Sequence, residues 1–556
     1  MPANSQEISL SALRRSAAEL LACSVMRLYP NTMLVSGEST DLGFFYDFVF
    51  EHAFSDADLI MVEEHMRALV RDNTPVRSTE MMRENAANLF THHGQEIQAS
   101  VVLDVQENIV SVFQINDFYD YCPLPHVANT SEVASFKLLK FTEWDYLLTE
   151  DEDISITRIT GTAFPDAASL KQHLKRLDTA KKRDHQMLGM QMDLFSHTLE
   201  SDYLWHPKGT CLRNLLIDLW KNIAAAHQFQ PISTPIPLLP GHDSQIICSL
   251  QHALIYAARE RNEEDLPIRF SEWDQWFNDD NEDDDALFEP MTCSGDFESV
   301  FCKTENLASE LKSSLQFIQE IVRILGFECR WVLVHCRKEF QPFSEEEKVA
   351  LEAMKKALKQ AGLDFTQDDR EGDFAEVSAE ALITDILGRE WRGPWVSVDF
   401  GTLDDLELRY RTSSGSYADP AMVTMSAVGM LERLIALMIE RDGGVLPLWL
   451  VPEQVRVIAI GKLQAPYAEE VRQKVAQAGF RVGIDLSNEK LGAKIHRAEE
   501  EKIPFMLIIG EKEQSKQEIA VRDSRHEQPS KTMSLEAFLE EARRIAHEEE
   551  RRRLES

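Results

Sequence analysis

The chain has 556 residues, with 58 Lys and Arg against 94 Asp and Glu, which gives a formal net charge of −36. This length predicts several domains, roughly three or four. A hydrophobic content of 44% excludes a collagen-like or globally disordered chain. Because no run approaches about 18 apolar residues, and residues 1–7 lack the features of a secretory signal, we expect a cytoplasmic protein without a membrane-spanning segment.

The cysteines and the basic residues narrow the possible partners. Eight cysteines without a Cys-x-x-Cys pair favour reduced, buried thiols, and their spacing predicts no metal site. Residues 451–556 hold 19 Lys and Arg against 20 Asp and Glu, so nearly all of the negative charge lies in the first 450 residues. If any part contacts a polyanion, this tail is the candidate, since phosphate binding needs dense basic side chains.

The first 205 residues predict an α+β region followed by a long helix. The apolar spacing predicts a helix over 8–30, stopped by Pro30, and another over 56–72. Residues 44–50 and 100–105 are expected to be strands. Residues 166–195 predict one connecting helix of about eight turns.

The rest of the chain predicts a mixed region and then a compact α/β region. Between residues 206 and 452 the pattern predicts strands at 329–334 and 395–400 and helices at 211–226, 303–325, 345–361 and 420–440. Beyond Pro452 it predicts strands at 455–460, 480–486, 504–509 and 518–522 and helices at 467–478, 488–500 and 534–552. Strands that alternate with helices imply a largely parallel sheet.

Several segments carry a resemblance to a known family. Residues 483–495, 504–513 and 519–522 closely resemble the anticodon-binding domain of threonyl-tRNA synthetase. Three further segments, 164–166, 181–185 and 204–209, are similar to the junction between the editing and catalytic domains of that enzyme. Residues 122–127 resemble the Cys/His segment of its editing domain. The resemblance runs from about residue 10 to the end, without the small ubiquitin-like domain found in many members.

The resemblance implies a multidomain α+β and α/β protein. Its expected parts are an editing-like α+β domain (1–165), a connecting helix and linker (166–205), a class II antiparallel-sheet domain (206–452) and an α/β anticodon-binding domain (453–556). Function has to be judged site by site, because one fold hosts many functions.

The synthetase site looks degenerate in this chain. The zinc ligands of the family fall at Ser249, Ser299 and Thr424, with Cys248 one residue out of register, and zinc needs Cys, His or carboxylate donors. The motif 2 arginine that holds ATP falls at Asn278, followed by the acidic run 279–285, which disfavours phosphates. Motif 3 alone is intact and ends at Arg433, a candidate γ-phosphate ligand. We therefore expect neither zinc nor ATP to bind.

The editing site looks half retained. Asp120, Cys122 and His126 match the family, and Cys122 with His126 could activate water. The two histidines of the editing helix are replaced by Arg15 and Glu19, which we expect to form an exposed ion pair.

The tail, by contrast, keeps its expected residues. Asn488, Glu513 and Arg522 match family residues that read the second and third anticodon bases, and their side chains suit hydrogen bonds to splayed bases. Lys490, Lys494 and Arg497 share one predicted helix face and are expected to contact phosphates.

The sequence thus favours a paralogue that binds threonine tRNA but has lost aminoacylation. It is expected to form a homodimer through motif 1 (215–235), as class II enzymes do, and to bind no DNA. Two alternatives stay open. One is an active threonine–tRNA ligase with an atypical site, which would need ATP and zinc; the other is a trans-acting deacylase of mischarged tRNA that uses Cys122 and His126.

Overall fold

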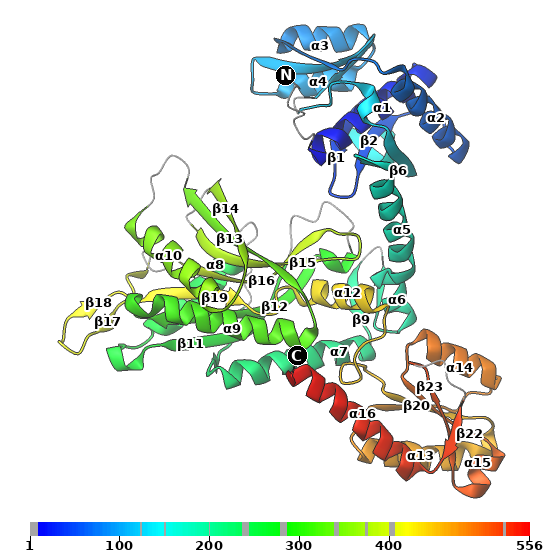
Figure 1. Cartoon of the computed structure of the whole chain (residues 1–556), viewed down its shortest axis with the longest axis vertical. Helices are drawn as coiled ribbons and strands as arrows, with labels where there is room; N and C mark the ends of the chain where they lie inside the picture. Colours follow the sequence, from blue (N-terminus) through cyan, green and yellow to red (C-terminus); the bar gives the residue numbers. More distant parts are fainter. Residues whose placement is uncertain are drawn as a thin grey trace, which may run out of the picture. The chain divides into compact units, whose positions relative to one another are not determined.

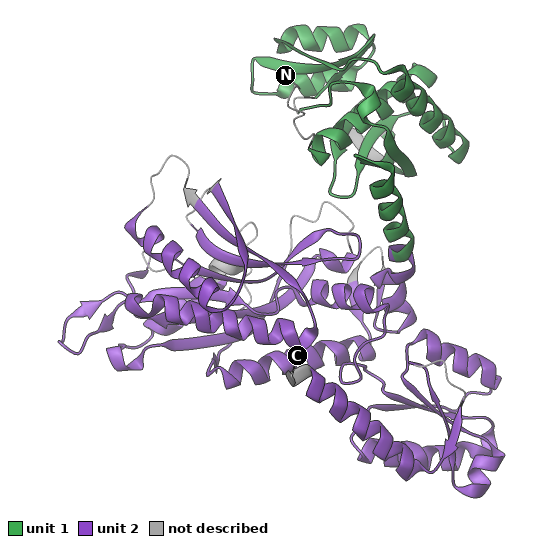
Figure 2. Ribbon diagram, viewed as in Figure 1, with its two compact units in different colours: residues 1–179 green, residues 180–556 purple. Residues whose placement is uncertain are grey.

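The computed structural model describes residues 9–555, apart from segments 123–124, 150–151, 199–200, 236–243, 278–285, 339–343, 373–375, 400–405 and 526–529. The chain divides into two compact units, residues 1–179 and 180–556 (Figure 2). The finer boundaries expected at residues 165, 205 and 452 stay predictions.

Unit 1 is built around an antiparallel sheet with the order β1-β2-β7-β6 (Figure 1). Its strands are β1 (Met33–Ser39), β2 (Phe44–Val49), β6 (Ser135–Thr149) and β7 (Glu152–Phe164). Helices α1 (Leu10–Leu28) and α2 (Asp56–Asp72) pack on it. Both helices and strand β2 match the elements expected from the sequence. Helix α1 is buried almost all round between Ala12 and Val25, so its polar positions also face the core.

A smaller sheet completes unit 1, with the order β3-β4-β5. It consists of β3 (Arg77–Met82), β4 (Ile109–Ile115) and β5 (Phe118–Tyr121), beside α3 (Arg83–His92) and α4 (Glu96–Asp104). The strand expected at 100–105 is therefore wrong, because this segment lies mostly in α4. Buried Ala99 and Val102 pack against this small sheet, and that packing overrides the β-branched character of the segment.

The expected eight-turn helix over 166–195 is also wrong. Helix α5 (Ala167–Arg183) ends before Asp184, whose carboxylate accepts a hydrogen bond from the Met187 N–H at 2.8 Å. Asp184 thereby caps a second, short helix, α6 (His185–Gln191).

The centre of unit 2 is an eight-stranded, mainly antiparallel sheet with the order β10-β11-β12-β19-β16-β15-β13-β14. Its strands are β10 (Gln230–Pro231), β11 (Ile268–Phe277), β12 (Thr292–Cys302), β13 (Cys329–Lys338), β14 (Phe365–Gly372), β15 (Glu376–Thr384), β16 (Glu390–Asp399) and β19 (Ala421–Ser426). The hairpins β8 (Phe195–Thr198) with β9 (Ser201–Trp205) and β17 (Tyr410–Arg411) with β18 (Tyr417–Ala418) lie outside it.

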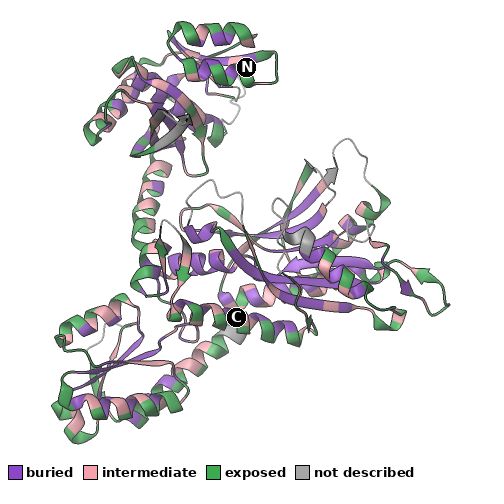
Figure 3. Cartoon of the chain, turned by 180° about the vertical axis from the view of Figure 1, so that it is seen from behind, coloured by how far each residue is buried: buried purple, intermediate pink, exposed green. Residues whose placement is uncertain are grey.

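Helices α7 (Pro207–Ala226), α9 (Leu307–Leu325), α10 (Glu345–Gln360) and α12 (Leu431–Asp442) share the main hydrophobic core with this sheet. The inner strands β12, β15 and β19 and helix α12 are mostly buried (Figure 3). Helix α8 (Ser244–Ala257) contacts β12. The helix expected over 420–440 is wrong in its first part, since 421–426 form strand β19 and the helix begins at Leu431. Every residue of β19 is buried, so its sequence shows no alternation of polar and apolar residues that would distinguish a strand from a helix.

The tail forms a separate five-stranded sheet, called here the C-terminal sheet, with the order β21-β20-β22-β23-β24. Strands β20 (Val455–Ala459), β21 (Val482–Asp485) and β22 (Phe505–Ile509) are parallel, and β23 (Ile519–Asp523) and β24 (Lys531–Met533) are antiparallel. The helices are α13 (Ala465–Gln477), α14 (Leu491–Glu500), α15 (Glu511–Lys516) and α16 (Leu535–Glu555). The expected α/β alternation is confirmed. No helix in the described part of the chain is long and apolar enough to cross a membrane.

Candidate functional sites

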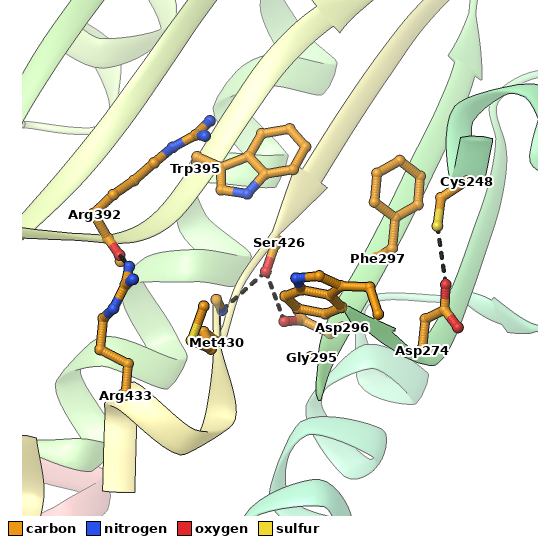
Figure 4. Close-up of a pocket in the computed structure, with 13 residues that line it drawn as sticks. Cys248, Asp274, Gly295, Asp296, Phe297, Arg392, Trp395, Ser426, Met430 and Arg433 are labelled. Carbon is orange, nitrogen blue, oxygen red and sulfur yellow. Dashed lines mark hydrogen bonds between the residues drawn. The ribbon is translucent and has the colours of Figure 1, made fainter. Parts of the chain in front are cut away.

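A cavity of about 200 Å³ opens on one face of the large sheet (Figure 4). Strand β11 contributes Asp274 and Trp276, β12 contributes Gly295, Asp296 and Phe297, and α8 contributes Cys248. The remaining lining residues come from β16, from β19 and the segment that follows it, and from α12: Arg392, Gly393, Trp395, Ser426, Gly429, Met430 and Arg433. Of the residues that the sequence places at or beside the synthetase site, Cys248 and Arg433 line this cavity.

The residues at the three zinc positions do not fit a zinc ion. Ser299 and Thr424 pair with each other across β12 and β19, and all three side chains are buried hydroxyls, which are not zinc donors. The Ser299 hydroxyl is already hydrogen-bonded to His252 Nδ1 at 2.7 Å. His252 is fully buried, and its Nε2 lies 3.5 Å from Glu272 Oε1. At one of these positions, Ser299, the hydroxyl is thus already used by a buried imidazole.

Two groups among the described residues bring three potential metal donors together. In the first, Asp184 accompanies His185 and Glu440, and His185 already hydrogen-bonds Glu440 at 2.8 Å and the Leu287 N–H at 3.2 Å. The second comprises Cys248, Glu272 and Asp274. There the Cys248 thiol donates to Asp274 at 3.1 Å, and Glu272 accepts from the backbone N–H and hydroxyl of Thr234. In both groups, hydrogen bonds within the protein explain why the potential donors lie close together.

Arg433 lies in the cavity wall, but its guanidinium already forms hydrogen bonds and an ion pair with other residues of the protein. Its Nε donates to the Phe288 carbonyl at 2.8 Å and its Nη1 to the Arg392 carbonyl at 3.0 Å. Its Nη2 pairs with Glu289 at 3.4 Å. Binding of a γ-phosphate by Arg433 stays a prediction, and it requires some of these contacts to break. Asn278 and the acidic run 279–285 lie outside the described residues.

The editing-like site contains a buried acid cluster. The carboxylate of Asp120 accepts hydrogen bonds from the Tyr46 hydroxyl at 2.6 Å and from Gln98 Nε2. Burial raises the pKa of Asp120, while burial and the neighbouring Asp120 charge raise the pKa of Glu19 well above its usual range. Burial lowers the pKa of His126 to about 4, so this imidazole is neutral at physiological pH.

The ion pair expected between Arg15 and Glu19 is wrong. Glu19 is only 1% exposed and shares hydrogen bonds with Asp120 and Cys122. Arg15 instead donates to the Gly37 carbonyl. The structure thus brings Glu19, Asp120 and Cys122 together, and burial beside Asp120 favours the protonated form of Glu19. Whether Cys122 and His126 activate water stays a prediction.

The raised pKa of Glu19 predicts a pH effect on the stability of unit 1. A carboxyl whose pKa rises on folding holds its proton more tightly when folded, so the free energy of unfolding falls as the pH rises above the unfolded value, near 4.5. Gln cannot ionise, and its amide can donate to Asp120. We expect Glu19→Gln to melt at a higher temperature than the wild type, by a margin that grows as the pH rises above about 4.5. Calorimetry of the unit 1 transition measures this, with exposed Glu64→Gln as control. Parallel pH curves for wild type and Glu19→Gln would contradict it.

The proposed anticodon readers occupy different parts of the C-terminal sheet. Asn488 is exposed after β21, and Glu513 accepts the Gly510 N–H at 3.0 Å near the start of α15. Arg522 lies opposite Met506 on β22, is 39% exposed and pairs with Glu499. Met506, the partner of Arg522, lies three residues before the end of β22, which corresponds to about 10 Å along the strand. The turn that leads to Glu513 begins at that end. That spacing allows contacts with different bases, which remain predictions.

The phosphate contact expected for Lys494 is wrong. Its side chain is 1% exposed, its Nζ donates to the Ala459 carbonyl at 2.8 Å, and Asp485 lies 3.5 Å away. A side chain held beneath the surface in this way cannot reach a phosphate. Lys490, the N-cap residue of α14, is exposed, and its contact with a phosphate stays a prediction.

Sequence reasoning assigned no role to the acid and aromatic residues of the cavity. Asp274, Trp276, Phe297 and Trp395 line it, although none of them matches a zinc or ATP ligand of the family. One signal was present: side chains alternate along a strand, so Glu272, Asp274 and Trp276 necessarily share one face of β11.

Comparisons with known proteins agree with this arrangement. Residues 454–545 match the family model described as anticodon binding domain, and residues 110–159 match the threonyl and alanyl tRNA synthetase second additional domain. The chain is 33% identical to a threonine–tRNA ligase from Nitrosococcus oceani, over 96% of this chain and 87% of that protein. It is 32% identical to the corresponding ligase from Oleidesulfovibrio alaskensis, over 92% and 84%.

Solved structures confirm the fold. The chain resembles a crystal structure of the RNA binding domain of threonyl-tRNA synthetase from Cryptosporidium parvum Iowa II, with a TM-score of 0.57 and 24% identity. That match covers 65% of this chain and 98% of the other. A prolyl-tRNA synthetase from Cryptosporidium parvum matches with a TM-score of 0.51 and 14% identity, over 67% and 78%.

Proposed function

Since the chain belongs to the threonine–tRNA ligase family, we propose that it binds threonine tRNA through its C-terminal domain and does not aminoacylate it. The main support for the loss of aminoacylation is the chemistry of the residues at the zinc positions. Ser249, Ser299 and Thr424 offer buried hydroxyls, and Ser299 already bonds His252. Without the ion that would hold the amine and hydroxyl of threonine, the cavity lacks its means of selecting that amino acid.

The ATP side of the reaction supports the same proposal. The guanidinium of Arg433 is committed to Phe288, Arg392 and Glu289. At the motif 2 position the sequence has Asn278 in place of the arginine that would hold the α-phosphate, followed by a run of carboxylates. Each of these differences weakens the stabilisation of phosphate charge, which is the main task of such a site. A cytoplasmic homodimer formed through residues 215–235 is part of this proposal.

Threonine-dependent exchange of pyrophosphate into ATP tests the loss of activity. We expect no exchange above a protein-free blank at enzyme concentrations where an active family member gives a strong signal. Because exchange requires threonine and ATP to react but not tRNA, a tRNA-binding defect cannot mimic this outcome. Robust exchange would establish instead a threonine–tRNA ligase with an atypical site.

A further inference from the structure

We propose that the cavity on the large sheet binds a small organic primary ammonium ion, held by Asp274 against an aromatic wall. This inference goes beyond the proposed function, because it assigns a ligand class to the site from which threonine chemistry has been lost. It does not depend on tRNA binding. Its basis is the charge balance, the wall and the size of the cavity.

Asp274, which is 8% exposed, is one of two buried carboxylates in the cavity lining. Its described hydrogen bonds come from the Cys248 thiol at 3.1 Å and the Gln275 N–H at 2.8 Å, and neither donor is positively charged. Among the described residues, no basic side chain forms an ion pair with Asp274. A carboxylate buried without a cation is costly, so a cationic ligand would be stabilised here.

The second carboxylate of the lining, Asp296, also has only neutral donors, whereas both arginines are paired with carboxylates outside the lining. Asp296 accepts three hydrogen bonds, from the Ser426 hydroxyl and from the backbone N–H groups of Ala427 and Val428. Arg392 pairs with Glu380 at 3.1 Å and Arg433 with Glu289 at 3.4 Å. The uncompensated charge of the described cavity is therefore negative.

The wall beside Asp274 is aromatic. Phe297 and Trp395 form a buried cluster with Cys248, and their ring centroids lie 6.2 Å apart. Trp276, from the same face of β11 as Asp274, adds a third ring to the lining. Aromatic faces attract cations, and an Arg392 guanidinium already lies 5.4 Å from the Trp395 ring centroid. Rings next to a buried carboxylate suit an ammonium group with an apolar substituent.

The size and the charge together define the ligand class. A dry apolar cavity of about 150 Å³ can hold benzene, so about 200 Å³ accommodates an amine of roughly six to ten heavy atoms. A free amino acid also carries a carboxylate, which would need a positively charged partner in the cavity. Arg392 and Arg433 are already paired with Glu380 and Glu289, so they do not supply one. We therefore expect amines such as butylammonium or benzylammonium to bind in preference to zwitterions.

Titration calorimetry on the full-length protein, with chloride salts at constant ionic strength, tests this assignment. Butylammonium and benzylammonium should bind the wild type, and uncharged butanol should bind at least about ten-fold more weakly than butylammonium. Asp274→Asn, which keeps the shape, should weaken amine binding by at least about ten-fold. Exposed Asp364→Asn is the matched control and should leave it unchanged. Unliganded Asp274→Asn should melt at or above the wild-type temperature, because it removes an uncompensated buried charge.

Three results would overturn the assignment. One is the absence of binding by either amine. Another is equal binding by wild type and Asp274→Asn, or by butylammonium and butanol, which would mean that the carboxylate does not select the ligand. The third is stoichiometric binding of Zn²⁺ or Mg²⁺ that Asp274→Asn abolishes and that excludes the amines. None of these measurements involves tRNA or pyrophosphate exchange, so failure here leaves the proposed function standing.

Discussion

Replacing Lys494 by alanine is expected to destabilise the C-terminal sheet by about 3–5 kcal/mol, the usual cost of removing one partner from a buried ion pair. The Lys494 ammonium lies between the Ala459 carbonyl and the Asp485 carboxylate, with the side chain 1% exposed. Burial favours the neutral form of Asp485, but the Ser487 hydrogen bonds and the Lys494 and Arg497 charges hold its pKa below the usual value. Without Lys494, Asp485 loses its closest cation and the Ala459 carbonyl loses a donor.

Hydrogen exchange of the amides in β20 and β22, measured by mass spectrometry on the full-length chain, reports on this sheet. A loss of 3–5 kcal/mol corresponds to exchange that is roughly 100- to 1000-fold faster, or more. Lys490→Ala is the matched control, because Lys490 is exposed at the start of α14 and its loss should leave exchange unchanged. Lys494→Met should be milder than Lys494→Ala, since methionine fills most of the vacated space. Equal exchange in Lys490→Ala and Lys494→Ala would show that the buried pair is not stabilising.

Lys494 also shows where sequence patterns lose their predictive power. The pattern over 488–500 correctly predicts a helix, but the direction of each side chain depends on how α14 lies against the C-terminal sheet. Lys490, Lys494 and Arg497 share one helix face by spacing, yet Lys494 turns out to be buried and Lys490 exposed. Helical spacing identifies neighbours and does not say which neighbour faces the core.

Glu19 illustrates the same limit in unit 1. An i, i+4 pair of opposite charges on a helix is usually an exposed ion pair. Helix α1, however, is buried on nearly every side, so Glu19 meets Asp120 and Cys122 from a distant part of the sequence. Such a long-range contact is not encoded in a local window.

Strand β19 and helix α4 show how the environment decides the type of an element. A central strand buried on both faces is apolar at every position and resembles a buried helix. In α4, a β-branched run becomes helical because Ala99 and Val102 fit the core on one helix face. The C-terminal sheet was easier to predict, because strands and helices alternate there with clear turn signals between them. The cavity was hardest, since Asp274, Phe297 and Trp395 meet from three strands.

Full-length protein is expected to bind threonine tRNA more tightly than a tRNA that differs only in the second and third anticodon positions. The reason is that Asn488, Glu513 and Arg522 present amide, carboxylate and guanidinium groups suited to base edges, and each lost base contact costs about 1–3 kcal/mol. Arg522→Ala should therefore reduce the discrimination between the two RNAs. Since the Arg522 guanidinium pairs with Glu499 in the free protein, reading a base requires that contact to loosen.

Lys490→Ala separates base reading from general attraction in the same experiment. If Lys490 contacts a phosphate, its removal should weaken the binding of both RNAs about equally. It should also lower the slope of log affinity against log salt concentration by roughly 0.7–0.9. Arg522→Ala should instead change the ratio of the two affinities. Because the first 450 residues carry nearly all of the net charge of −36, every affinity has to be measured at one stated ionic strength. Equal binding of the two RNAs by the wild type would mean that Asn488, Glu513 and Arg522 do not read bases, and the tRNA specificity proposed for this chain would then lose its physical basis.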